Sequence, residues 1–259
     1  MASSCALSWA FRSAARVVVV GVIGLGVGAI GLGGFASNAA DPALSIQDPF
    51  TKDSHPQRIA VRGDWQFENG VAACVADPEL YKKFKNHGPI IRYPIAYGGG
   101  DGEQLLVEFE AKPKDVSRLV VTLNGDGHVY RIIMPGVSPP KSKPAASSSA
   151  ASADSPNQTK KQNARPASSA TRVLAWAERS GPDRPGDSQR PQNLPTLMSL
   201  DNEWTPFRIV IEDGSAEVSI GEDRWEDSRK ALSREMGEFT ISFAFGKLEL
   251  RNLRLAVTD

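Results

Sequence analysis

The chain has 259 residues, of which 41% are hydrophobic, so it is long enough to bury the core of one large domain or two small ones. Its 30 Lys and Arg residues balance its 30 Asp and Glu residues. Because neither sign of charge dominates, the composition does not favour nucleic acid or an anionic surface as a partner, and we expect no nucleic-acid binding.

The first forty residues differ in composition from the rest. Arg12 and Arg16 precede an uncharged run over residues 17–35, and small residues follow up to Ala40. This layout is typical of a secretory signal peptide. A retained membrane anchor is the alternative, because a span needs about 17 to 25 apolar residues. Either interpretation predicts an exported chain, periplasmic, secreted or on the outer face of the membrane, with membrane contact only if the segment stays uncleaved.

The next stretch, residues 41–58, is polar with scattered prolines and predicts a lead-in to a β domain over residues 59–259. Asn69-Gly70 predicts the turn of a first strand pair. Residues 77–84 predict one short helix, because a proline follows an aspartate that can cap it.

Two segments lack apolar periodicity. Residues 138–171 are rich in Ser, Ala, Pro and Lys and predict a disordered insertion, and residues 180–195 predict a long loop. The basic residues of the first segment suit either a solvated insertion or an arm for a polyanion. Because both segments lie between strands, we predict one domain.

The middle of the chain has alternating apolar residues over 105–110 and 118–123, and a return strand from His128 after a turn at 124–127. We expect the polar side of these strands to form one exposed face and to be the best location for a site. It carries Glu108, Glu110, Arg118 and Arg131.

The strongest pattern lies in the last quarter. Residues 205–212 and 216–220 alternate in hydrophobicity around Asp213-Gly214, a pair that tolerates positive φ, and so predict an antiparallel hairpin.

Residues 239–245 carry large rings on one face and predict an inner strand. In the final strand the apolar parity switches from even to odd, which predicts a β-bulge at Arg251-Asn252. Four apolar residues from these strands are expected to point into one shared interior: Phe207, Ile220, Phe243 and Leu253.

The patterns at residues 203–209, 250–255 and 63–71 resemble the two ends of the 3-keto-disaccharide hydrolase-like family. The resemblance implies an all-β fold, a concanavalin-like jelly-roll antiparallel β-sandwich, with glycoside hydrolysis as an activity. The family has an Asn-Ser-Gly segment ending in Arg at mid-domain, whereas residues 117–122 of this chain depart from that pattern.

Three residues are candidates for catalysis. Glu108 and Glu110 lie two apart on one strand, about 7 Å at a rise of ~3.3 Å per residue. This suits an inverting glycosidase, whose carboxylates lie ~6.5 to 9.5 Å apart, but it also fits any exposed strand. His128 follows the hairpin turn and is either catalytic or a surface residue. None of the three histidines shows metal-ligand spacing, so we expect no metal and no cofactor.

Four residues are candidates for ligand binding: Arg118, Arg131, Trp176 and Trp225. The two tryptophans are flanked by charged residues and could stack on sugar rings, whereas Trp65 and Trp204 are expected to pack. The sequence thus predicts an exported, non-catalytic module that binds carbohydrate or a cell-envelope component. A glycoside hydrolase is the first alternative, and a structural envelope protein without a small ligand is the second.

Overall fold

The computed structural model describes residues 44–51, 55–83, 88–136, 169–178 and 186–259, all of which belong to one compact unit, Ala40–Asp259. The predicted signal segment and nearly all of the predicted insertion lie outside the described residues. Among the residues described, no helix is long and apolar enough to cross a membrane.

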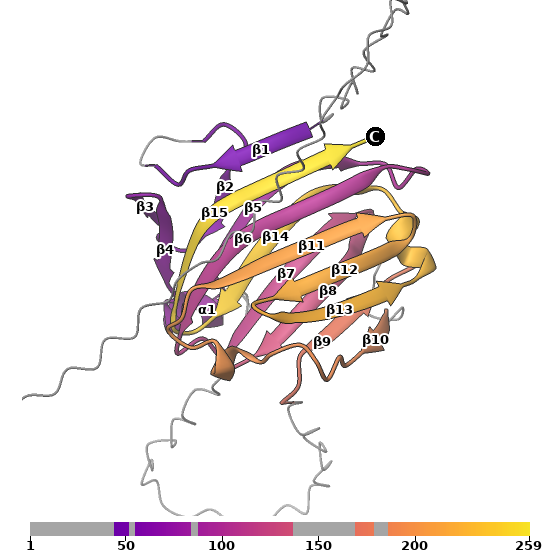
Figure 1. Ribbon diagram of the computed structural model, residues 1–259. Helices are drawn as coiled ribbons and strands as arrows, with labels where there is room; N and C mark the ends of the chain where they lie inside the picture. The colour runs from indigo at the N-terminus through magenta and orange to yellow at the C-terminus, as the bar shows by residue number, and fades with distance from the viewer. Residues whose placement is uncertain (1–43, 52–54, 84–87, 137–168, 179–185) are drawn as a thin grey trace, which may run out of the picture. The chain divides into compact units, whose positions relative to one another are not determined.

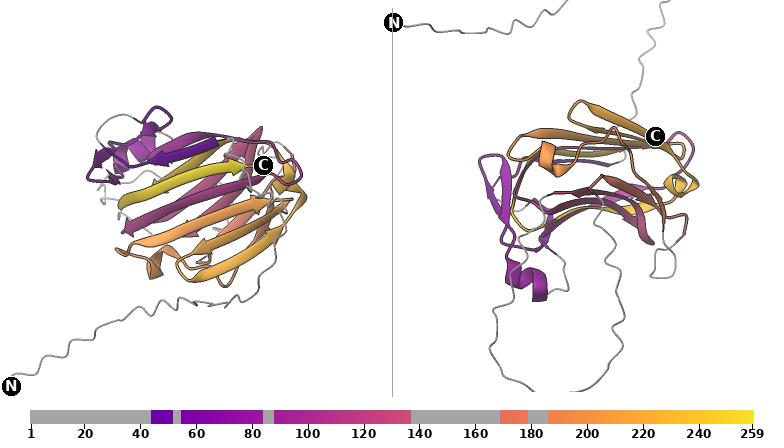
Figure 2. Two further views of the ribbon diagram at one scale, coloured as in Figure 1. Left: turned by 45° about the horizontal axis from the view of Figure 1, so that its top comes forward. Right: turned by 90° about the horizontal axis from the view of Figure 1, so that it is seen from below.

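The unit is an all-β jelly-roll sandwich of two antiparallel sheets, seen edge-on as two layers in the right-hand view of Figure 2. Sheet A has the order β13-β12-β11-β6-β15-β4-β3, and β1 also pairs with β15. Its strands are β1 (Leu44–Asp48), β3 (Gln66–Glu68), β4 (Val71–Val75), β6 (Gln104–Lys114), β11 (Thr205–Glu212), β12 (Ser215–Ile220), β13 (Asp223–Ser228) and β15 (Lys247–Thr258).

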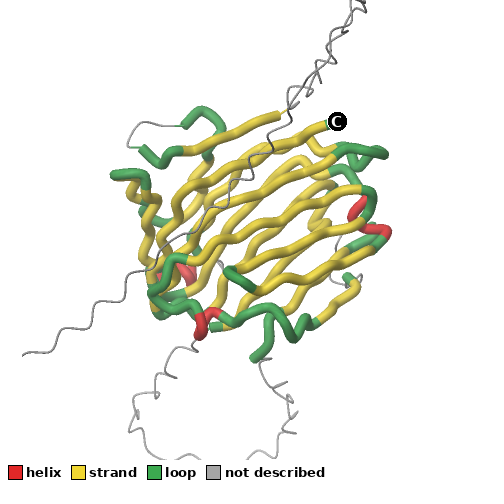
Figure 3. Tube along the Cα trace, viewed as in Figure 1, coloured by secondary structure: helices red, strands yellow, loops and turns green. Residues whose placement is uncertain are grey.

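Sheet B has the order β10-β9-β8-β7-β14-β5-β2 and lies behind sheet A in Figure 1. Its strands are β2 (Ile59–Arg62), β5 (Ile90–Tyr97), β7 (Arg118–Gly125), β8 (Gly127–Pro135), β9 (Arg172–Ala175), β10 (Asp187–Gln189) and β14 (Met236–Ala244). Among the described residues, helical structure is confined to short segments at the periphery, as Figure 3 shows. These are α1 (Pro78–Lys83) and two 3-10 turns, Leu197–Ser199 and Lys230–Ser233.

The two sheets bury one shared hydrophobic core. Phe109 of β6 stacks on Phe207 of β11 with ring centroids 4.8 Å apart, and it lies 6.1 Å from Phe239 of β14 in the opposite sheet. Fully burying one such side chain contributes about 1.5–3 kcal/mol. The four residues predicted to point inward are all buried in this core: Phe207, Ile220, Phe243 and Leu253.

Several local predictions are confirmed. Asp213 and Gly214 both have positive φ and join β11 to β12, which pair antiparallel as predicted. The register of β15 against β6 shifts between Arg251 and Arg254, and Asn252 has a φ of 55°. The extra residue at this bulge explains why Leu248 and Leu255 both face the core despite their different parity.

Three strands lie where no strand was predicted. β1 falls in the expected lead-in, where it pairs with β15 and buries Ile46, so the sandwich begins before Ile59. β10 falls in the expected loop 180–195, and β13 forms the edge of sheet A. In β10 all three residues are exposed, and in β13 only Asp227 is buried, so neither has the apolar alternation that reveals a strand in sequence.

Candidate functional site

A polar network crosses the outer face of sheet B. Arg131 Nη2 donates to His128 Nε2 at 2.5 Å, and His128 Nδ1 donates to Asn124 Oδ1 at 2.7 Å. Asn124 Nδ2 donates in turn to Glu238 Oε1 at 3.1 Å, and Arg92 Nη1 lies 3.1 Å from Glu238 Oε2. These side chains come from β8, β7, β14 and β5, so four adjacent strands hold one continuous chain of contacts.

A bulge in the β7–β8 hairpin brings His128 onto this face. Leu123 pairs with Tyr130, but the next residue, Asn124, pairs with His128, so Val129 is the extra residue. Strict alternation would place His128 and Arg131, three residues apart, on opposite sides of β8. The extra residue reverses the parity and lets both side chains reach each other.

Trp176 lies next to the network, directly after β9. Its ring centroid is 5.8 Å from that of His128, and the Arg131 guanidinium carbon is 5.7 Å from the indole centroid. The backbone is held at this point, because Trp176 N donates to Val129 O at 2.9 Å and Arg234 Nη1 donates to Trp176 O at 2.8 Å. The indole is half-buried, so part of an aromatic surface borders the polar groups.

Gly186 sets the position of the Trp176 ring. A Cβ atom at residue 186 would lie 2.7 Å from the indole and 2.7 Å from the carbonyl oxygen of Ala175. We therefore expect Gly186→Ala to displace Trp176 and to weaken ligand binding at this face several-fold. Gly100→Ala is the matched control, because a Cβ there meets no atom within 4 Å. Unchanged affinity in Gly186→Ala, measured by isothermal titration calorimetry, would show that the position of the ring is immaterial.

His128 is neutral at physiological pH. Burial, followed by the positive charge of Arg131, lowers the pKa of His128 from its ordinary value of 6.5 to about 4. The neutral imidazole can accept the hydrogen bond from Arg131 at Nε2 while donating from Nδ1. A pKa this low does not suit a general base working near neutral pH. His128 therefore orients Asn124 and Arg131.

This pKa makes stability depend on pH. Between about 4 and 6.5 the unfolded chain binds a proton at His128 that the folded chain does not, so the free energy of unfolding falls as the pH falls through this range. We expect the His128 Cε1 proton resonance to titrate with a midpoint near 4, and His128→Gln to lose this part of the pH dependence. A midpoint near 6.5 in the folded protein would contradict the neutral network.

Two surface depressions flank the network. One, of about 550 Å³, is lined by Asn124, Glu238 and the end of β5. The other, of about 620 Å³, is lined by Trp176, Arg229 and Lys230.

Glu108 and Glu110 do not share this face. They lie on β6 in sheet A, whereas Arg118 and Arg131 lie on β7 and β8 in sheet B, so the single polar face predicted for these strands is divided between opposite sides of the sandwich. Residues 115–117 carry the chain across from one sheet to the other. Apolar alternation is the same whichever strand is the neighbour, so it could not reveal this crossing.

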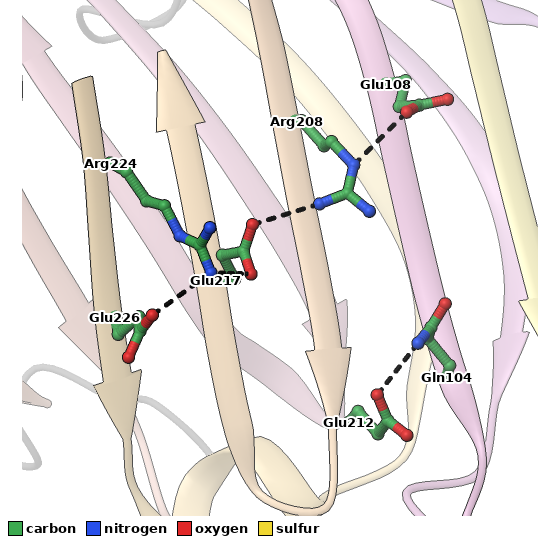
Figure 4. Close-up of polar contacts among 7 residues, drawn as sticks. All are labelled: Gln104, Glu108, Arg208, Glu212, Glu217, Arg224 and Glu226. Carbon is green, nitrogen blue, oxygen red and sulfur yellow. Dashed lines mark hydrogen bonds and ion pairs between the residues drawn. The ribbon is translucent and has the colours of Figure 1, made fainter. Parts of the chain in front are cut away.

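Glu108 belongs to a ladder of ion pairs across β6, β11, β12 and β13, shown in Figure 4. Arg208 lies 3.4 Å from Glu108 and 3.2 Å from Glu217, and Arg224 lies 2.6 Å from Glu217. Glu226 continues the ladder at 3.2 Å from Arg224.

Glu110 is held by Arg251 at 2.6 Å and by Asn252 at 2.5 Å. Burial alone would raise the pKa of Glu110, but these hydrogen bonds and the charge of Arg251 outweigh it and lower the pKa. A general acid needs a raised pKa, so the environment of Glu110 does not suit that role.

The remaining predicted site residues, Arg118 and Trp225, also lie on different sheets. Arg118 starts β7 on the outer face of sheet B, near the network. Trp225 lies on β13 of sheet A, where it is half-buried against the core and has the Arg229 guanidinium 5.9 Å from its ring. In the part of the chain described, no group of three or more His, Cys, Asp or Glu side chains could hold a metal ion.

Sequence reasoning missed three members of the network: Arg92, Asn124 and Glu238. Asn124 was interpreted only as a turn residue, and Arg92 and Glu238 lie in different parts of the sequence. Only the register of β5, β14 and β7 brings them together, with Glu238 paired to Pro94 on one side and to Asn124 on the other.

No family model matches the sequence, and no curated protein matches it. Solved structures match the fold at low identity. A sialidase aligns over 83% of this chain at 9% identity with a TM-score of 0.49, and the chain spans only 18% of that sialidase. The β-glucanase of Bacillus licheniformis aligns over 83% of this chain and 98% of its own at 11% identity, with a TM-score of 0.49.

A galectin of Caenorhabditis elegans aligns over 65% of this chain and 89% of its own, at 11% identity with a TM-score of 0.37. At such identities the likeness concerns the fold alone. The resemblance to 3-keto-disaccharide hydrolases therefore stays a prediction, whereas the arrangement of the strands themselves establishes the jelly-roll sandwich.

Proposed function

We propose that the outer face of sheet B binds a saccharide and that the protein is an exported, non-catalytic carbohydrate-binding module. The observation that carries the proposal is the Arg131–His128–Asn124–Glu238 network beside the indole of Trp176. Saccharide hydroxyls need donors and acceptors fixed at short spacing, and the apolar face of a sugar ring stacks on an aromatic side chain. This face presents both.

The network is suited to binding because its members fix one another. Arg131 donates to Thr122 through Nε at 3.2 Å and to His128 through Nη2, which holds the guanidinium in one orientation. Glu238 is fixed by Asn124 and Arg92. Groups held in place before the ligand arrives lose little conformational entropy when it binds.

Glycoside hydrolysis, including hydrolysis of 3-keto-disaccharides, is the alternative. Its carboxylate candidates, Glu108 and Glu110, lie on sheet A, where Arg208 and Arg251 hold them. Hydrolysis requires one carboxyl group to donate a proton to the leaving oxygen. The contacts with Arg251 and Asn252 lower the pKa of Glu110, and Glu108 is paired with Arg208 on the face opposite the network, so this pair favours hydrolysis less than the network favours binding.

A saccharide array probed with the full chain, followed by turnover assays on each bound compound, tests the proposal. We expect retention of one class of saccharide without release of product. Hydrolysis of a bound saccharide that is abolished by Glu108→Gln would establish the enzyme instead. Absence of binding across the array would favour a structural envelope protein.

A further inference from the structure

Three arginines gather on the outer face of sheet B around Ile133 of β8. Arg131 lies two residues before it on the same strand, and Arg172 of β9 is its direct cross-strand partner. Arg118 of β7 lies two residues before Val120, which is the partner of Ile133 on the other side. Diagonal neighbours of this kind are about 7–8 Å apart, within reach of long side chains.

Among the described residues, the positions around Arg131 and Arg172 are poor in negative charge. The outward positions that border them on β7, β8 and β9 carry no carboxylate: Val120, Thr122, Pro135 and Leu174. Within the described residues, neither Arg131 nor Arg172 forms an ion pair. The acidic member of the network, Glu238, lies 3.1 Å from Arg92.

The electrostatics agree with this geometry. Burial, followed by the positive charges of Arg118 and Arg172, lowers the pKa of Arg131 to about 10. Like charges held together on a half-buried surface destabilise one another, and an anion bound between them relieves that repulsion. Arg131 uses Nε and Nη2 for Thr122 and His128, so its remaining donors can serve a ligand.

We propose that the saccharide bound at this face is acidic, and that Arg131 and Arg172 bind its carboxylate or sulfate group. This inference rests on the proposed saccharide site and adds the class of ligand. Guanidinium groups bind such anions through paired, charge-assisted hydrogen bonds. The sugar ring that carries the acidic group would lie next to Trp176, because Arg131 belongs to the arginine cluster and its guanidinium carbon is 5.7 Å from the indole centroid.

Matched ligand pairs that differ only in charge give the test. The full chain is titrated with tetragalacturonate and its methyl ester, and with a κ-carrageenan tetrasaccharide and its desulfated form, which carries no other charged group. We expect one acidic member to bind at least about tenfold more tightly than its neutral counterpart, the difference shrinking as salt is added. Arg172→Gln should remove this preference. Arg254→Gln, which removes a similar charge from sheet A, should leave it unchanged.

The outcomes are distinguishable. If the neutral members bind as tightly as the acidic ones and Trp176→Ala weakens both, the saccharide site stands and the acidic class is wrong. If Arg172→Gln and Arg254→Gln lower the affinity for the acidic member equally, the preference depends on the net charge of the protein alone, and the proposed anion site is wrong. Binding of inorganic sulfate as tight as that of the saccharides would also overturn it. If no member of either pair binds but a neutral saccharide from the array does, the acidic class is wrong and the saccharide site stands. If no saccharide binds at all, both the acidic class and the proposed function are wrong.

Discussion

Arg131→Ala is expected to abolish measurable saccharide binding. The substitution removes a charged donor, the hydrogen bonds that fix His128 and Thr122, and the cation beside the indole of Trp176. A hydrogen bond to a charged group contributes about 1.5–3 kcal/mol, so loss of the ligand contact alone lowers affinity roughly 10- to 100-fold. Isothermal titration with the best ligand from the array measures the effect.

Arg208→Ala is the matched control for this experiment. Arg208 is also an outward-facing arginine in a polar network, but it lies on sheet A. Its removal should leave affinity unchanged within error. If Arg208→Ala lowers the affinity and Arg131→Ala does not, the ligand binds to the opposite face of the sandwich.

Asp48→Ala is expected to have the largest effect on stability. The Asp48 carboxylate is fully buried and accepts hydrogen bonds from Phe50 N at 2.8 Å, Arg58 Nη1 at 2.9 Å and Tyr93 Oη at 2.7 Å. Because Asp48 belongs to β1 and Tyr93 to β5, this cluster joins the two sheets across the core. The substitution removes the carboxylate that the buried Arg58 and Tyr93 side chains bind, which costs about 3–5 kcal/mol.

For a domain of this size, a loss of 3–5 kcal/mol corresponds to a melting temperature lower by roughly 10 °C. Urea denaturation followed by tryptophan fluorescence measures the change in the free energy of unfolding. Glu226→Ala is the control, because its ion pair with Arg224 is exposed and contributes about 0–1 kcal/mol. If Asp48→Ala and Glu226→Ala lower the free energy of unfolding by the same amount, Asp48 does not join the sheets.

The centre of the fold could be predicted because it depends on alternation and turn chemistry. β11, β12, β14 and β15 place apolar residues at every second position, and the parity switch in β15 predicts the bulge at Arg251-Asn252 that its register with β6 shows. The edges were missed for the opposite reason. β1, β10 and β13 are short or polar, and they are strands because a neighbour supplies hydrogen bonds.

The site was harder to predict, because it depends on which strands are neighbours. The sequence predicts a shared face for Arg118 and Arg131 and indicates His128 and Trp176 separately, and the four lie on or beside one face. Glu108 and Glu110 have the same outward parity, but β6 pairs with β11 and β15 in the other sheet. The contact between His128 and Arg131 also requires the extra residue at Val129, for which the sequence shows no parity signal.

The central claim is that the saccharide lies on the outer face of sheet B, and backbone and side-chain NMR shifts during ligand titration test it most directly. The account predicts that the indole of Trp176 and the resonances of Asn124, His128 and Arg131 shift in proportion to occupancy, while those of Arg208 on sheet A stay in place. Shifts confined to sheet A, or none at saturating ligand, would contradict it.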